Sequence, residues 1–245
     1  SVRGVGAGKM AGVWQWSGGS HCPPVYGFET QAGAAPGATF SEYEKAVRLA
    51  GGEVRRFFLR QEAGYQVTAD YADAVQPGDS VVFLCNPNNP TAPWRSGDGG
   101  GAAQRLWQVG AVLVVDECFL PFTDGRSCQS RLRAYPNLMV LRAFTKLYAM
   151  AGLRLGYLMC ADGDLAGRIG AWGQSWSVSA PAQVAGLAAV SEEGWPERTR
   201  RFLRMERPWM TDALGALGFF VYPPTATFCY FRRDLICGTG RWPGA

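Results

Sequence analysis

The sequence predicts an α/β protein with a mostly parallel sheet, because strand-like and helix-like segments alternate along most of its 245 residues. After an extended segment at Val54–Leu59 come three short apolar runs bounded by turn residues: Val81–Cys85, Ala111–Val115 and Leu138–Leu141. Runs of this kind are typical of strands buried on both faces of a parallel sheet. With 47% hydrophobic and 18% charged residues, the chain has the composition of a globular protein.

Helices and a second group of strands complete this interpretation. The residues after Ser41 have amphipathic spacing and end at Gly51-Gly52, while Pro181–Val190 and Trp195–Leu217 predict two later helices. Short strands are expected at Phe219–Tyr222 and Phe228–Phe231. We therefore expect a large α/β domain over residues 36–194 and a partial small α+β domain over 195–245. Residues 1–35 are Gly-rich, show neither helical nor strand period, and are set apart as atypical.

The composition argues against several classes of protein. A formal net charge of +4 without a dense Lys/Arg block indicates neither nucleic-acid binding nor an anionic membrane surface. The chain contains no apolar run of the roughly 20 residues that a membrane-spanning helix needs, and its start has no signal-peptide layout. Seven scattered cysteines without a C-x-x-C pair predict reduced thiols and a cytoplasmic protein. The single histidine, His21, argues against a zinc site or a Ser-His-Asp triad.

Polar residues follow each of the three apolar runs. An amide-rich segment follows the first, Asp116-Glu117 the second, and a segment ending in Lys146 the third. Ligands of open α/β sheets bind outside the carboxyl ends of the strands, so these groups predict a site at that edge. Taken singly, each of these groups has a common structural explanation. Asn-Pro pairs are usually turns, an Asp at a strand end often caps a helix, and a single Lys is usually solvated. Their joint spacing favours the site.

The motifs at these strand ends resemble those of the class I/II aminotransferases, the fold-type I enzymes that use pyridoxal 5'-phosphate (PLP). The nearest branch holds threonine-phosphate decarboxylase and histidinol-phosphate aminotransferase. The resemblance runs from about Ala38 to Phe231, and it implies a three-layer α/β/α large domain. It is carried by Asn86-Pro87-Asn88-Asn89-Pro90-Thr91, Val114-Val115-Asp116-Glu117, Phe144-Thr145-Lys146 and Gly152-Leu153-Arg154-Leu155-Gly156-Tyr157.

The resemblance implies two catalytic residues. Lys146 is the lysine that would bind PLP covalently and later move protons at the substrate Cα. Asp116 would pair with the pyridine nitrogen and keep it protonated, so that the ring can accept electrons released at Cα.

Four further residues are implied as cofactor ligands. Asn89 would hydrogen-bond the 3' oxygen of the ring, and Phe40 would stack on its face. Arg154 and the hydroxyl of Thr145 would hold the phosphate, which suits the planar fork of an arginine. The resemblance also implies an amino-acid or phospho-amino-acid substrate and a homodimer, whose active sites lie at the subunit interface.

Two departures bear on the reaction. Ala143 stands where many relatives place Ser or Thr, and Phe119 stands where many place a Tyr that reaches the 3' oxygen. With Thr39-Phe40-Ser41-Glu42-Tyr43-Glu44, they favour the threonine-phosphate decarboxylases of cobalamin biosynthesis, which form aminopropanol phosphate. A histidinol-phosphate type aminotransferase and an inactive, truncated fragment of either enzyme are the alternatives, because both reactions use the same residues.

Two family features are not found in the sequence. A small-residue turn that binds the cofactor phosphate should precede Phe40, and an arginine for the substrate carboxylate is expected near the C-terminus. Codons can be chosen so that a one-nucleotide shift spells such a turn within residues 8–37. We therefore interpret residues 1–35, and with them 92–103 and 234–245, as segments in a shifted reading frame.

Overall fold

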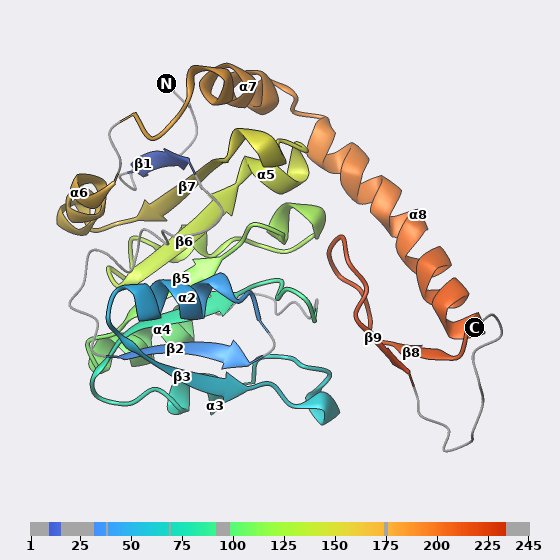
Figure 1. Ribbon diagram of the computed structural model, residues 1–245, viewed down its shortest axis with the longest axis horizontal. Coiled ribbons are helices and arrows are strands. Elements are labelled where there is room, and N and C mark those ends of the chain that lie inside the picture. The colour runs from blue at the N-terminus through green and yellow to red at the C-terminus, as the bar shows by residue number, and fades with distance from the viewer. Residues whose placement is uncertain are drawn as a thin grey trace.

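The computed structural model describes residues 10–15, 32–37, 39–68, 70–91, 99–173 and 176–233, and its main body is a seven-stranded sheet with helices on both faces (Figure 1). The strand order is β1-β7-β6-β5-β4-β2-β3. Register pairs show that β2, β3, β4, β5 and β6 run parallel, whereas β7 runs antiparallel to both of its neighbours. The predicted mostly parallel sheet is therefore confirmed.

Three central strands are the most buried part of the sheet. They are β4 (Asp79–Cys85), β5 (Val112–Asp116) and β6 (Leu138–Ala143). Every residue of β5 is buried, as expected for a strand covered on both faces. The edge strand β3 (Glu53–Phe58) is partly exposed, and β7 (Leu155–Cys160), which the sequence patterns did not indicate, is almost wholly buried.

Two strands lie where the sequence predicted none. β1 (Met10–Gln15) pairs with β7, and β2 (Ala32–Gly37) lies between β3 and β4. Residues 1–35 show no strand period in the sequence, yet neighbouring strands supply backbone partners to both segments, and the Gly- and Ala-rich β2 gives little signal by itself. The shifted-frame interpretation stays a prediction. Much of the sequence that it concerns, including 16–31, 92–98 and 234–245, lies outside the described residues.

Side chains alternate between two cores, one on each face of the sheet. Val114 and Met139 point to one face, where they meet Tyr43 of α2 and Ile169 of α6. The other core contains Leu113 and Val140 with side chains from α3, α4 and the η3 turn. The helices are α2 (Glu42–Leu49), α3 (Asp70–Asp73), α4 (Gly99–Gln108) and α6 (Gly163–Trp172), and the turn is η3 (Cys128–Arg131). This is the three-layer α/β/α arrangement predicted from the family resemblance.

The C-terminal part of the described chain leaves this body along a long helix (Figure 1). After α7 (Ala180–Ser191), α8 (Trp195–Ala216) leads to a separate two-stranded antiparallel sheet of β8 (Phe219–Val221) and β9 (Phe231–Arg233). A strand was predicted at Phe228–Phe231, but only Phe231 of that run belongs to β9. Residues 222–230 form the loop between β8 and β9. Within the described part of the chain, no helix has the length and apolar character to cross a membrane.

Candidate active site

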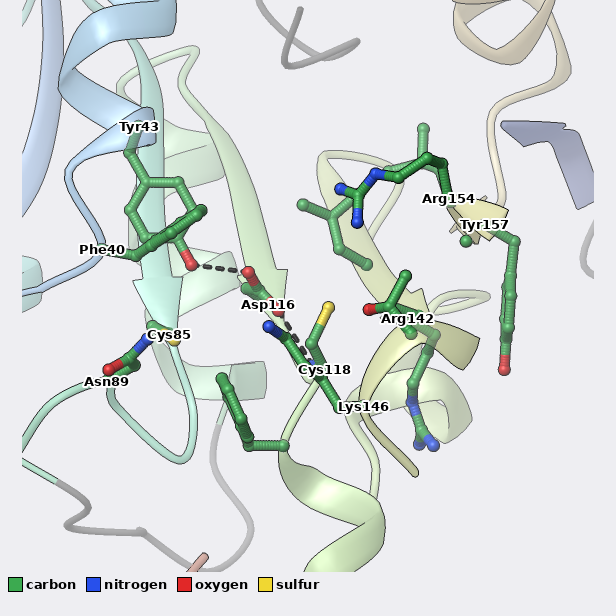
Figure 2. Close-up of a pocket in the computed structure, with 16 residues that line it drawn as sticks. Phe40, Tyr43, Cys85, Asn89, Asp116, Cys118, Arg142, Lys146, Arg154 and Tyr157 are labelled. Carbon is green, nitrogen blue, oxygen red and sulfur yellow. Dashed lines mark hydrogen bonds between the residues drawn. The ribbon is translucent and has the colours of Figure 1, made fainter. Parts of the chain in front are cut away.

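One pocket lies at the carboxyl ends of β4, β5 and β6, where parallel α/β sheets place ligands (Figure 2). It contains every site residue predicted from the sequence, brought from segments up to 114 positions apart. Its lining includes the following predicted residues: Phe40, Asn89, Asp116, Thr145, Lys146 and Arg154. The sequence therefore predicted which residues meet, while their roles remain proposals.

Asp116 lies at the centre of the pocket with both carboxylate oxygens engaged. Its Oδ2 accepts a hydrogen bond from the Tyr43 hydroxyl at 2.6 Å, and its Oδ1 accepts one from the backbone N–H of Cys118 at 2.9 Å. The residue is only 7% exposed. Each carboxylate oxygen can accept more than one hydrogen bond, so Asp116 can still receive a proton donor from a ligand.

Tyr43 is a site residue that the sequence interpretation missed. It lies three residues after Phe40 in the first turn of α2, and its ring stacks on Phe83 at a centroid distance of 4.9 Å and an interplanar angle of 10°. Burial, and then the charge of Asp116, raise the pKa of Tyr43 well above its ordinary value. The hydroxyl therefore stays protonated and donates to Asp116. Its spacing from Phe40 was the only signal in the sequence, and amphipathic packing explained it equally well.

Lys146 is placed by an abrupt change from strand to helix. β6 ends at Ala143, and the single-turn helix α5 (Phe144–Leu147) begins at the next residue. The lysine is exposed within the open pocket, and its Nζ lies 5.6 Å from the ring centroid of Phe119. An ammonium over an aromatic ring is attracted by the electron-rich face of the ring. Among the described residues, no carboxylate pairs with this lysine.

Arg154 occupies an unusual backbone conformation at the opposite side of the pocket from Phe40 (Figure 2). Its φ of 57° lies in the left-handed region, which is uncommon for a residue with a side chain. Such strain occurs mainly where the surrounding structure requires one orientation, as at ligand sites. Two residues later, Gly156 permits close approach of β6, since a Cβ there would lie 3.0 Å from the Arg142 carbonyl oxygen.

The Asn-Pro segment after β4 is held by side-chain hydrogen bonds. Asn88 is buried; its Oδ1 accepts from the Thr39 hydroxyl at 2.6 Å, and its Nδ2 donates to Thr91 Oγ1 at 2.7 Å. These bonds join the segment to the residue before Phe40. Asn89 directly follows this anchored residue and lines the pocket.

Glu117 follows Asp116 directly but takes no part in lining the pocket. Its carboxylate is 1% exposed and accepts from Arg142 Nε at 2.9 Å, from the Ser127 hydroxyl at 2.6 Å and from the Cys128 N–H at 2.6 Å. Arg142 has its guanidinium directed away from Asp116 in Figure 2. This ion pair ties the end of β5 to β6, which indicates a structural role.

The donor set of the pocket fits a planar, phosphate-bearing pyridine. Asp116 offers an oriented carboxylate for a ring N–H, Asn89 an amide for a ring oxygen, and Lys146 an amine for a carbonyl carbon. Arg154 offers a guanidinium for a phosphate. Phe40 offers an aromatic ring for stacking.

A family model described as aminotransferase class I and II matches residues 28–233. A threonine-phosphate decarboxylase from Salmonella typhimurium is 36% identical over 199 residues, which are 80% of this chain and 54% of that relative. A histidinol-phosphate aminotransferase from Oleidesulfovibrio alaskensis is 32% identical over 203 residues, which are 81% of this chain and 52% of the relative. The chain therefore spans about half the length of the curated relatives it matches.

Solved structures show the same fold at lower identity. The histidinol-phosphate aminotransferase of Clostridium acetobutylicum superposes with a TM-score of 0.76 and 22% identity, covering 87% of this chain and 65% of that one. The L-threonine-O-3-phosphate decarboxylase of Porphyromonas gingivalis gives a TM-score of 0.73 and 24% identity, covering 86% and 63%. These likenesses confirm the fold class predicted from the sequence.

Proposed function

The chain belongs to the class I and II aminotransferase family of PLP-dependent enzymes, and from that premise we propose that it decarboxylates L-threonine O-3-phosphate to aminopropanol phosphate in cobalamin biosynthesis. One observation carries the PLP part of the proposal: a single pocket holds Lys146, Asp116 and Arg154 in an arrangement that suits this cofactor. The choice of reaction is supported by the 36% identity to a threonine-phosphate decarboxylase and by the Ala143 and Phe119 departures.

Bound PLP supplies an electron-accepting ring that stabilises the negative charge left at the substrate Cα when CO2 leaves. Asp116, oriented by Tyr43, keeps a proton on the pyridine nitrogen. Lys146 Nζ would hold the cofactor and, once released from it, would carry a proton to Cα after CO2 has left. Arg154 and Thr145 bind the cofactor phosphate, while Phe40 and Asn89 set the plane of the ring.

The test begins with the absorbance spectrum of the purified chain after addition of PLP, beside a Lys146→Ala variant. A visible band that the variant lacks identifies Lys146 as the cofactor lysine. Lys45→Ala is the matched control, because Lys45 lies on the outside of α2 and pairs with Glu42. O-phosphothreonine is then assayed for CO2 release, and a chain that forms the band but releases no CO2 contradicts the decarboxylase proposal.

An aminotransferase of the histidinol-phosphate type is the second candidate, supported by the 32% identical relative. Only a transaminase needs a 2-oxo acid to accept the amino group. Turnover of histidinol phosphate that depends on such an acid would replace the decarboxylase proposal. If neither protein forms the band, the third alternative holds, an inactive fragment of either enzyme.

We also propose that the protein is a homodimer. The helix α7 is apolar around most of its circumference, and yet Val184, Leu187 and Val190 are 68%, 70% and 45% exposed. A helix of this composition is usually buried, so a second copy is a suitable partner for this face. Leu187→Glu should shift the molar mass in solution from dimer to monomer, whereas Glu193→Ala, an exposed change beyond the end of the helix, should not.

We also propose that the protein is located in the cytoplasm. The five cysteines within the described residues are all free thiols: Cys85, Cys118, Cys128, Cys160 and Cys229. Unpaired thiols are typical of reducing compartments.

A further inference from the structure

A guanidinium on α8 joins two loops that belong to different parts of the molecule. Arg207 donates from Nη2 to the Phe122 carbonyl oxygen at 2.7 Å and from Nε to the Ala226 carbonyl oxygen at 2.9 Å. Phe122 is the last residue of the turn η2 (Leu120–Phe122), which follows β5 and its final residue Asp116. Ala226 lies in the loop between β8 and β9. Figure 1 shows this loop extending from the two-stranded sheet along α8 toward the main body.

The two loops meet again at the wall of the pocket. Phe228, two residues after Ala226, packs its ring edge to face with Phe119 at a centroid distance of 4.9 Å and an angle of 85°. Phe119 also contacts Phe122, at 6.3 Å. The same Phe119 ring lines the pocket and lies 5.6 Å from Lys146 Nζ. A continuous set of contacts therefore runs from the C-terminal loop to the lysine.

We propose that Arg207 is a positioning residue, which holds Phe228 against Phe119 and so fixes the aromatic ring on which the Lys146 amine lies. The inference rests on the proposed function only in taking Lys146 as the reactive amine. With Arg207 in this role, the loop of the C-terminal sheet helps to determine the contact between Lys146 and Phe119, although Arg207 itself does not line the pocket.

The contacts of Arg207 differ from those of the other arginines on its helix. Arg200 and Arg204 pair with the carboxylates of Glu197 and Asp124, and Arg200 also donates to the Pro121 carbonyl oxygen in η2, but neither reaches the loop between β8 and β9 through a hydrogen bond among the described residues. Arg207 forms no ion pair with any described residue; both of its hydrogen bonds go to backbone carbonyl oxygens, and burial lowers its pKa. Binding two carbonyls in different directions requires the fork of a guanidinium, which a lysine ammonium does not reproduce with the same geometry.

The test measures the reactivity of Lys146 in the full chain without PLP or substrate, by limited acetylation with acetic anhydride and peptide mass analysis. Attraction between the Phe119 ring and the Lys146 side chain holds the amine against the ring, so loss of that contact leaves the amine more accessible to the reagent. We expect Arg207→Met, Arg207→Lys and Phe228→Leu each to speed acetylation of Lys146 about two- to fivefold, the factor expected for one cation–π contact. Phe228→Tyr keeps an aromatic edge and should retain the parent rate.

Two controls separate positioning from damage to the fold. Lys45 on α2 is acetylated in the same sample, and its rate should stay constant in every variant. Arg201→Met removes an exposed arginine from the same helix and should leave Lys146 unchanged. In the double variant Arg207→Met/Phe228→Leu, a rate equal to that of the faster single variant supports one shared route to Lys146.

An unchanged Lys146 rate in Arg207→Met and Phe228→Leu overturns the inference, and so does a double variant in which the two effects multiply. A parallel rise at Lys45 also overturns it, because it would mean general loosening of the fold. None of these outcomes depends on the substrate. A chain that releases no CO2 from O-phosphothreonine would therefore refute the proposed reaction and leave this inference to be decided by the acetylation rates alone.

Discussion

Two carboxylates that adjoin in the sequence lie in contrasting regions at the end of β5. Asp116 faces the pocket and accepts one hydrogen bond on each oxygen, from Tyr43 and from the Cys118 N–H. Glu117 faces away from it, is 1% exposed, accepts three hydrogen bonds from Arg142, Ser127 and Cys128, and forms an ion pair with Arg142. Successive side chains of a strand point to opposite faces, which separates the two groups completely.

The contrast shows how hydrogen-bond acceptor capacity distinguishes a carboxylate that is available to a ligand from one that is used within the protein. Glu117 has its capacity filled by protein donors, so it holds β5, β6 and the η3 segment together. Asp116 keeps spare capacity in an open pocket, where a ligand can use it. Burial and charge alone do not distinguish the two residues, since both are buried carboxylates.

The largest effect on activity is expected from Asp116→Asn. The amide has nearly the same shape, but it cannot offer a negative charge to the pyridine nitrogen, so kcat/KM should fall by roughly a thousandfold, typical of losing one key electrostatic contact. The thermal midpoint should change little. Steady-state kinetics and calorimetry on the PLP-loaded chain check this, and a variant with near-parental turnover would remove Asp116 from the mechanism.

Glu117→Gln should have the opposite profile. Removing the charge leaves Arg142 partly buried without its partner, which costs about 3–5 kcal/mol of unfolding free energy. Turnover per folded molecule should stay within severalfold of the parent at low temperature. Urea unfolding followed by far-UV circular dichroism measures the first quantity, and active-site titration normalises the second. Equal losses in activity for the Asn and Gln variants would abolish the distinction between the two carboxylates.

Tyr43→Phe should give an intermediate result, since it removes only the hydroxyl that orients Asp116. We expect about a tenfold loss of kcat and about 1–3 kcal/mol of stability, the usual cost of an unsatisfied buried partner. Tyr71→Phe is a matched control, because that buried hydroxyl donates to the Phe83 carbonyl oxygen instead of to a site carboxylate. The control should lose stability without the tenfold loss of kcat.

The smallest effect concerns pH. The pKa of Tyr43 is raised on folding, so its contribution to stability is complete below its unfolded pKa of about 10 and is lost as pH rises toward the folded value. The unfolding free energy should therefore start to fall above about pH 10, and less steeply in Tyr43→Phe. Unfolding curves at a series of alkaline pH values measure both slopes, and identical slopes would show that Tyr43 ionises normally in the folded chain.

Local sequence features predicted much of this molecule. The runs that became β4, β5 and β6 were visible because strands buried on both faces must be almost wholly apolar. The polar residues after them were recognisable because parallel strands present their carboxyl ends at one edge. Family motifs then assigned Lys146 and Arg154, and the family match over residues 28–233 confirms the family predicted.

Partners distant in the sequence were decided by the tertiary structure alone. The pairing of β1 with β7 and of β2 with β3 and β4 depended on the neighbouring strands, and the Gly- and Ala-rich β2 carries little β signal of its own. The Tyr43–Asp116 hydrogen bond spans 73 residues, and the contact between Phe228 and Phe119 spans more than 100. The sequence by itself determined which residue types stand at strand ends, because burial and chain direction act locally. Only packing between layers decided which side chains meet, because that depends on how separate elements come together in space.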